Sequence, residues 1–244
     1  MKILASLLLL AAAGAHADEA PVAPYRPSVS SPAQLPVAGQ LEFEVGGLHQ
    51  RSDDGHRNSL PYLFKLAFSE QWGVLVGGEA FVAAGGEHGV GDTSVVLKRA
   101  FILDEATALG LELGAKVPTA RDSIGSGKAD YTVNGILSRD IGAVHMDANL
   151  NLTRFGLQEP DAARSQAGAS ASFSTPLSGQ WGVTGELSGT RRGGAASTAQ
   201  VLAALSFSPS KRLVIDVGLA HGLNRASTDW QFFSGVVLPL AKLW

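Results

Sequence analysis

The feature that most constrains this chain is an alternation of apolar and polar residues that recurs from Leu41 onward. In the clearest case, residues 109–117, leucine, alanine and valine alternate with glycine, glutamate and lysine. A period of two places one set of side chains on each face of a β-strand. Each alternating segment spans about ten residues, which is the length that a tilted strand needs to cross a membrane. The pattern predicts an all-β protein whose sheet has one apolar and one polar face.

About twelve such segments follow one another, an even number that is typical of membrane-spanning antiparallel barrels. The expected strands lie at 41–46, 62–68, 72–79, 94–101, 109–117, 130–137, 145–152, 167–174, 181–188, 198–208, 213–221 and 230–238. Short turns are expected at 69–71, 104–106, 139–142, 177–180 and 209–211, and longer polar loops at 51–58, 85–91, 119–128, 156–165, 191–196 and 223–229. This alternation predicts an up-and-down β-barrel with both termini and all short turns on the periplasmic side.

The apolar face is expected to point outward. A barrel of about twelve strands is too wide for alanine, valine and leucine to fill its interior without voids. In a membrane the same residues contact lipid, and the polar phase lines a wet lumen. After residue 17 no apolar run approaches the roughly 18 residues of a transmembrane helix, so a closed barrel is the form that can span a membrane.

Polar side chains of the inward phase are therefore the candidates for setting solute selectivity. We expect the lumen to be lined by Glu42, Glu44, Lys65, Glu79, Lys98, Glu112, Lys116, Asp130, Asn134, His145, Asp147 and Asn149. Glu186 and Asp216 fall in the same phase. Charges of both signs are tolerated in water, whereas Arg or Lys on the lipid face costs roughly 2–4 kcal/mol at the membrane midplane.

Two residues depart from the pattern. Arg99 falls in the outward phase close to the turn at 104–106, so its side chain is expected to reach the membrane interface. Pro239 interrupts the last alternating segment, so the closing strand either ends near Leu238 or pairs imperfectly. The chain ends at Trp244, and a terminal aromatic residue is common in outer-membrane barrels.

The N-terminal residues have the pattern of an export signal. Lys2 precedes an apolar run too short to span a bilayer, and Ala15 and Ala17 form an A-x-A cleavage pattern. We expect residues 1–17 to be a signal peptide, residues 18–38 a Pro-rich periplasmic lead-in, and residues 39–244 the barrel. Prolines exclude a regular strand or helix from the lead-in. Its composition favours a disordered tether, and a short plug that folds into the lumen is the alternative.

Composition argues against several classes of partner. The formal net charge is −3 and no long basic run is present, so nucleic acid is not expected as a partner. The chain has no cysteine and its histidines are scattered, so no disulfide, metal site or cofactor is expected.

The sharpest enzymatic candidate is His145, which the period of two places on one inward face with Asp147 and Asn149. Outer-membrane lipases and deacylases use a histidine together with a serine and an acidic or amide residue. Their nucleophile must meet lipid from the outer surface, whereas His145 lies near a periplasmic turn and points inward. We therefore expect a polar pore lining and no catalytic residue.

A set of local motifs runs through the middle of the chain. These are Gly91-Asp92-Thr93, Leu97-Lys98, Leu113-Gly114-Ala115-Lys116-Val117-Pro118-Thr119, then Gly125, Gly127, Asp130 and Phe155. In these residues the chain resembles the outer-membrane family named "putative MetA-pathway of phenol degradation". The resemblance implies a transporter-like barrel, often associated with aromatic compounds, that has no assigned catalytic residue.

Together these patterns predict an outer-membrane channel or transporter for small solutes, with aromatic or hydrophobic compounds as candidate permeants. The expected partners are outer-membrane lipid and lipopolysaccharide, a small-molecule permeant and the barrel-assembly machinery. Arg191 and Arg192, on an expected outward loop, either contact lipopolysaccharide phosphates or form a solvated pair. Two other functions stay open, namely a lipid-modifying enzyme of the lipase or deacylase type and a structural or adhesive barrel.

Overall fold

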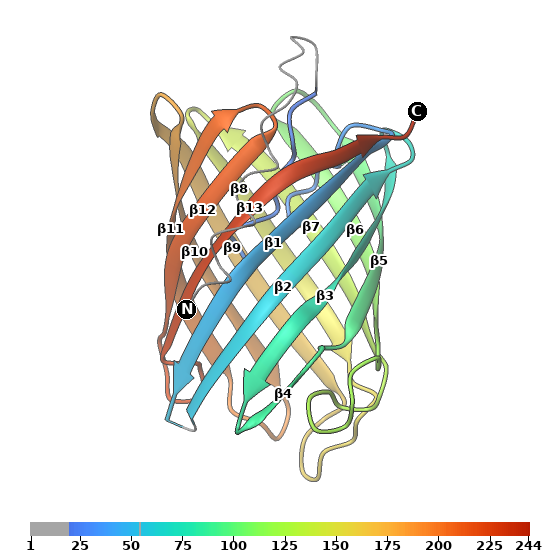
Figure 1. Ribbon diagram of the computed structural model, residues 1–244, viewed down its shortest axis with the longest axis vertical. Helices are drawn as coiled ribbons and strands as arrows, with labels where there is room; N and C mark the ends of the chain where they lie inside the picture. The colour runs from blue at the N-terminus through green and yellow to red at the C-terminus, as the bar shows by residue number, and fades with distance from the viewer. Residues whose placement is uncertain (1–19, 54) are drawn as a thin grey trace, which may run out of the picture.

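The computed structural model describes residues 20–53 and 55–244, so the expected signal peptide lies outside the described residues. The described residues form a closed, antiparallel, all-β barrel of twelve strands, with β4 as a short additional arm (Figure 1). The strands are β1 (Gln40–Ser52), β2 (Gly55–Ala67), β3 (Trp72–Ala84), β4 (Glu87–Gly89), β5 (Thr93–Ile102), β6 (Thr107–Val117), β7 (Asp130–Ile141), β8 (Val144–Arg154), β9 (Ser165–Ser178), β10 (Trp181–Arg192), β11 (Thr198–Ser210), β12 (Leu213–Gly222) and β13 (Trp230–Lys242). β1 pairs with both β2 and β13 and thereby closes the sheet. Among the described residues, no helix has the length and hydropathy of a membrane span.

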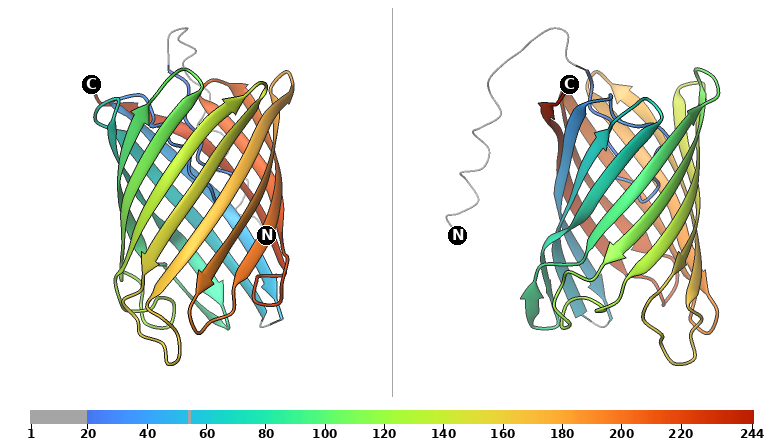
Figure 2. Two further views of the ribbon diagram at one scale, coloured as in Figure 1. Left: turned by 180° about the vertical axis from the view of Figure 1, so that it is seen from behind. Right: turned by 90° about the vertical axis from the view of Figure 1, so that its right-hand side faces the viewer.

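The two ends of the barrel differ, and we name them by their connections. The turn end carries the short connections, such as the one between β2 and β3, together with Gly39 and the C-terminus (Figures 1 and 2). The loop end carries the longer connections, including residues 118–129 and 155–164. The predicted up-and-down topology is therefore confirmed, and the periplasmic placement of the turn end stays a prediction.

The prediction of a long loop at residues 51–58 is wrong. β1 and β2 continue through this region as a hairpin, in which Arg51 pairs with His56 and Ser52 pairs with Gly55. Both strands are polar on both faces here, so the period of two disappears from the sequence although the strands continue. The alternation of apolar and polar residues indicates which part of a strand contacts lipid and does not indicate how long the strand is. It is lost where a strand extends beyond the apolar belt, the outward band that contacts lipid.

The apolar phase points outward along the strands, as predicted. On β8, for example, Leu150 is 72% exposed and Leu152 is 56% exposed. By contrast, the inward Lys65 and Lys98 are fully buried. A fully buried lysine and a largely exposed leucine are the reverse of a water-soluble fold. The outer surface is therefore one that lipid has to cover.

Arg99 lies in the outward phase near the turn end, as its position in the sequence predicts. Its guanidinium lies over the ring of Trp72 at 5.0 Å and over the ring of Phe101 at 4.5 Å. Another aromatic pair of the same end, Trp181 and Phe207, has ring centroids 4.8 Å apart. Cation–π contacts of this kind keep an arginine among the amphipathic rings that are enriched at a membrane–water interface.

The short turns use residues suited to their backbone. Gly142 and Gly179 have φ of 62° and 56°, which glycine adopts without steric cost. In the turn before β6, the Asp104 carboxylate accepts a hydrogen bond from the Ala106 amide at 2.8 Å, and this bond lowers the pKa of Asp104. Such turns fix the register of the hairpins that they join.

The closing strand takes the second of the two forms expected around Pro239. β13 continues past this proline to Lys242, and its pairing with β1 shifts register between Leu41 and Glu42. A bulge accommodates a residue that has no amide to donate.

Replacing Leu113 by arginine tests the outward face. Leu113 is 48% exposed near the middle of β6, so the charge would lie in lipid, and we expect a loss of roughly 2–4 kcal/mol in the free energy of unfolding. Denaturant titration of the protein folded into phospholipid vesicles measures this loss. The control is Thr132→Arg, in the inward phase of β7, which is expected to cost much less. Equal losses for the two variants would contradict the assignment of the faces.

Candidate functional site

Residues 20–38, which we call the plug, lie inside the barrel. The segment enters at the turn end, where the Val22 amide donates to the Lys211 carbonyl, and leaves where the Gly39 amide donates to the Ala67 carbonyl. Between these points it crosses the lumen within the half of the barrel nearer the turns (Figures 1 and 2). Of the two alternatives for the Pro-rich segment, the structure has the plug rather than the disordered tether.

The backbone amides of the plug donate to side chains of the barrel wall. Its prolines prevent it from joining the sheet, so its remaining buried amides need acceptors elsewhere. The pairs are Ala23 to Glu42 (3.1 and 3.2 Å), Tyr25 to Glu44 (2.8 Å), Val29 and Ser30 to Glu186 (2.9 and 2.8 Å), Ser31 to Asn149 (2.9 Å) and Ala33 to Ser138 (2.7 Å). These acceptors lie on β1, β7, β8 and β10, so the wall holds the plug from several sides.

Two buried lysines of the wall complete the inner contacts. The ammonium groups of Lys65 and Lys98 lie 4.6 and 4.2 Å from the centre of the Tyr25 ring. Each also donates to a plug carbonyl, that of Ala23 and of Pro32 respectively. Their ion pairs are Lys65 with Glu42 (3.0 Å) and Glu44 (2.5 Å), and Lys98 with Glu112 (3.0 Å). Buried charges persist only when they are paired and hydrogen-bonded, and the plug supplies part of that requirement.

Arg26 is the cation that the plug itself brings to the wall. Its Nε and Nη2 donate to the two carboxylate oxygens of Asp216 on β12, both at 2.9 Å, in a bidentate pair. Glycines make room for this group, since a Cβ on Gly46 or Gly235 would lie 2.8 or 2.5 Å from the guanidinium. Asp216 is only 2% exposed, so the pair is shielded from water on the side of the wall.

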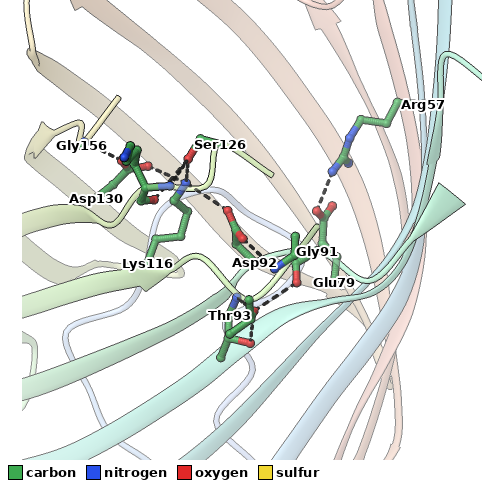
Figure 3. Close-up of polar contacts among 12 residues, drawn as sticks. Arg57, Glu79, Gly91, Asp92, Thr93, Lys116, Ser126, Asp130 and Gly156 are labelled. Carbon is green, nitrogen blue, oxygen red and sulfur yellow. Dashed lines mark hydrogen bonds and ion pairs between the residues drawn. The ribbon is translucent and has the colours of Figure 1, made fainter. Parts of the chain in front are cut away.

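The loop half of the lumen has a separate polar cluster (Figure 3). Lys116 contacts Asp92 at 3.1 Å, Asp130 at 2.9 Å and the Ser126 hydroxyl at 2.6 Å. Asp92 also accepts the Ala120 amide at 3.0 Å, and Asp130 accepts the Gly156 amide at 2.9 Å. These contacts fasten the loop at 118–129 to the wall. They unite the sequence motifs that carry the family resemblance, which lie far apart along the chain.

A further chain of side chains follows the inner wall of the loop half. Arg57 forms an ion pair with Glu79 at 2.5 Å and donates to Gln50 at 3.4 Å. Gln50 donates to Gln231 at 3.1 Å, which donates to Gln200 at 2.6 Å. This part of the lumen therefore presents amides and one paired cation.

A cavity of about 310 Å³ lies between the plug and the wall. Tyr25 and the carboxylate residues Glu44 and Glu112 border it, together with the side chains of Leu63 and Leu75. The apolar residues were not among the expected lumen candidates. They fall in the inward phase, but only polar and charged side chains of that phase were predicted as candidates.

His145 does not form a catalytic arrangement. Its Nδ1 lies 2.6 Å from Asp140 and its Nε2 lies 3.2 Å from Asp147. The hydroxyl of Ser138 donates to Asp147 rather than to the imidazole. Both ring nitrogens thus face carboxylates, whereas activation of a nucleophile requires a hydroxyl within hydrogen-bond reach of the base.

The structure divides the predicted lumen residues into groups. Those that contact the plug or lie beside it are buried, namely Glu42, Glu44, Lys65, Lys98, Glu112, Asn134, Asp147 and Asn149. Those in the loop half are Glu79, Lys116 and Asp130, and His145 lies at the turn end. Sequence reasoning missed Tyr25 and Arg26. It placed Glu186 and Asp216 in the inward phase, which the structure confirms, although they were not among the twelve selectivity candidates.

This closed barrel, with an apolar exterior and a charged interior, defines a transmembrane β-barrel protein. The chain belongs to the family described as "Putative MetA-pathway of phenol degradation", whose model matches residues 25–240. The match extends well beyond the motifs at 91–155 and includes most of the plug. A search of curated proteins gives no match.

Solved structures share the fold at low sequence identity. The chain is similar to the "COG4313 outer membrane channel from Pseudomonas putida F1", with a TM-score of 0.66 and 12% identity over 85% of this chain and 98% of the other. It is also similar to the "KdgM porin", with a TM-score of 0.59 and 11% identity over 81% of this chain and 99% of the other.

Cysteine labelling tests how the plug is held, because the chain has no cysteine of its own. Ser30 is fully buried and Val29 is 58% exposed, so Ser30→Cys should react with a maleimide slowly and Val29→Cys rapidly. Adding Glu186→Ala removes the acceptor of both amides and is expected to raise the rate at position 30 by about tenfold or more. Val29→Cys in the same background is the control. An unchanged rate at position 30 would contradict the anchoring role of Glu186.

Proposed function

We propose that the protein is an outer-membrane channel for small solutes, and that its plug must shift before solute passes through the turn half. The observation that supports this proposal is the way in which the plug is held. It is held by hydrogen bonds and ion pairs, among them the bidentate Arg26–Asp216 pair, by the Tyr25 ring beside two ammonium groups, and by a small apolar contact of Ala33 with Ala108 and Ile136. Polar contacts exchange with water at modest net cost, so a plug of this kind can leave its seat without unfolding the barrel.

The turn end is proposed to face the periplasm, which would put both termini of the mature chain on that side. In barrels of bacterial outer membranes the short connections lie on that side and the long loops face outward. A solute from outside would then meet the loop half first, with its amide chain and the cluster around Lys116, and would reach the plug afterwards.

The candidate permeants are small aromatic or hydrophobic compounds that carry a polar group. The cavity beside the plug joins the apolar side chains of Leu63 and Leu75 to the carboxylates of Glu44 and Glu112. A pocket that is largely apolar and has a few polar groups suits a ligand of the same character. The similar KdgM porin has been solved "in complex with disordered oligogalacturonate", an acidic sugar. Among the described residues here, the lumenal cations Arg57 and Lys116 are each paired with carboxylates, which disfavours an acidic polymer.

A sealed structural or adhesive barrel is the second candidate, because the plug lies across the turn half of the lumen. A lipid-modifying enzyme is not proposed, since the contacts of His145 do not provide an activated nucleophile. The channel and the sealed barrel differ in whether the plug ever leaves its seat.

Recording in planar bilayers distinguishes them. Arg26→Gln leaves Asp216 as a buried carboxylate without its partner, which strongly disfavours the seated plug, since breaking a buried pair costs roughly 3–5 kcal/mol. We expect brief, infrequent openings in the wild-type protein and at least a tenfold higher open probability in Arg26→Gln. The control is Arg57→Gln, which breaks an ion pair in the loop half and leaves the plug untouched. Silent bilayers for the folded wild-type protein and for Arg26→Gln would favour the sealed barrel.

The ion preference of the open channel tests the cluster in the loop half. Lys116→Glu replaces the cation between Asp92 and Asp130 and changes the local charge by two units. We expect the reversal potential in a salt gradient to shift toward cation preference. Lys128→Glu, on the adjoining loop, makes the same change of charge and is expected to produce a smaller shift. An unchanged preference in Lys116→Glu would remove this cluster from the conduction path.

A further inference from the structure

The outer wall carries an apolar groove that the proposed channel does not use. It has a volume of about 740 Å³ and lies over β7 to β11, on the wall that faces the viewer in the left panel of Figure 2. Ala169 and Ala171 of β9 form its floor, and Leu150 of β8 and Leu187 of β10 stand on either side.

The register of the strands explains the groove. Ala169 pairs with Leu150, and Ala171 pairs with Leu187, so each leucine stands beside an alanine on the same outward face. Leu150 is 72% exposed and Leu187 is 58% exposed. The small residues of β9 lie between larger residues of β8 and β10, and this difference in size leaves a groove that follows the strand direction.

Two arginines stand at the loop end of this groove. Arg154 continues the outward phase of β8 beyond Leu150, and Arg191 pairs with the outward Ala167 of β9. Both side chains are exposed, and neither guanidinium has a hydrogen bond or ion pair with a described residue. With one strand between them, their Cα atoms are roughly 10–12 Å apart, so both side chains can reach one group.

The neighbouring Arg192 differs from Arg191 in its contacts. It turns to the other face, pairs with Glu159 at 3.1 Å and lies 4.6 Å from the Phe155 ring. Of these two adjacent arginines, Arg192 is therefore paired within the protein, whereas Arg191 faces the surroundings of the barrel.

We propose that this surface binds a phosphorylated acyl lipid of the surrounding membrane leaflet. An acyl chain lies along β9 between Leu150 and Leu187, and the phosphate lies between Arg154 and Arg191. Guanidinium groups bind phosphate in a bidentate manner, and they do so more strongly where lipid excludes water. A second copy of the chain is a poorer occupant, because the outward residues of β7 to β10 include no carboxylate to meet these arginines.

Native mass spectrometry of the full barrel in a neutral maltoside detergent tests the proposal. The probes are phosphatidylglycerol and diacylglycerol with the same acyl chains, which differ in the phosphoglycerol headgroup. The wild-type protein is expected to retain phosphatidylglycerol preferentially. Arg154→Gln with Arg191→Gln is expected to lower its retention about tenfold, to the level of diacylglycerol. Ala171→Leu, which fills the floor of the groove, is expected to lower retention of both lipids.

The matched control is Arg51→Gln, an exposed outward arginine at the loop end of β1, away from the groove. It should leave retention unchanged, and replacing both groove arginines by lysine should preserve most of the preference for phosphatidylglycerol. Equal retention of the two lipids by the wild-type protein would overturn the proposal, as would full retention by the double glutamine variant. A dimer formed through β9 in place of lipid binding would also overturn it. Lipid retention is measured without any conductance, so the result of this test does not depend on whether the protein is a channel.

Discussion

Hydrogen bonds from the backbone of the plug to carboxylates of the wall are the interaction on which the interior of this barrel depends. A segment rich in proline cannot pair with a strand, and its remaining buried amides would be costly without acceptors. Glu42, Glu44 and Glu186 accept them, and in turn these carboxylates become buried. Lys65 then stabilises two of the carboxylates while donating to the plug. Each group is tolerable only because the others are present, so their contributions are not additive.

This mutual dependence divides the lumen into two regions of different character. In the turn half, charges of both signs are packed against the plug and away from water. In the loop half, Lys116 and the chain of glutamines remain accessible beside the long loops. The lumen charges expected from sequence to act as one selectivity lining therefore belong to two tasks. Under the proposed channel function, those in the turn half bias the equilibrium between a seated and a displaced plug, and those in the loop half face the entering solute.

The fold could be predicted from sequence because its main determinant is local. Residues 109–117 alone show that a strand has one apolar and one polar face, and the number of such segments along the chain gives the topology and indicates that the apolar face meets lipid. The hairpin at 51–58 was not predicted because it lies beyond the apolar belt, where nothing requires apolar and polar residues to alternate. The contacts of the plug were not predicted for another reason. Its partners are distant in sequence, with 190 residues separating Arg26 from Asp216, and composition does not record such pairings. The family match is more informative here, since it already begins at Tyr25.

The outward arginines also define where the membrane ends. Along β7 the outward residues run from Arg139 near the turn end to Tyr131 at the loop end, and those between them are uncharged. Eight residues of a tilted strand rise roughly 20 Å along the barrel axis, close to the apolar band of about 25 Å that such barrels have. Arg154 pairs with Tyr131 and therefore lies at the edge of this band nearer the loop end. Under the lipid site proposed above, this is the level of the lipid phosphates, which supply the counter-charge to a guanidinium that has no partner among the described residues.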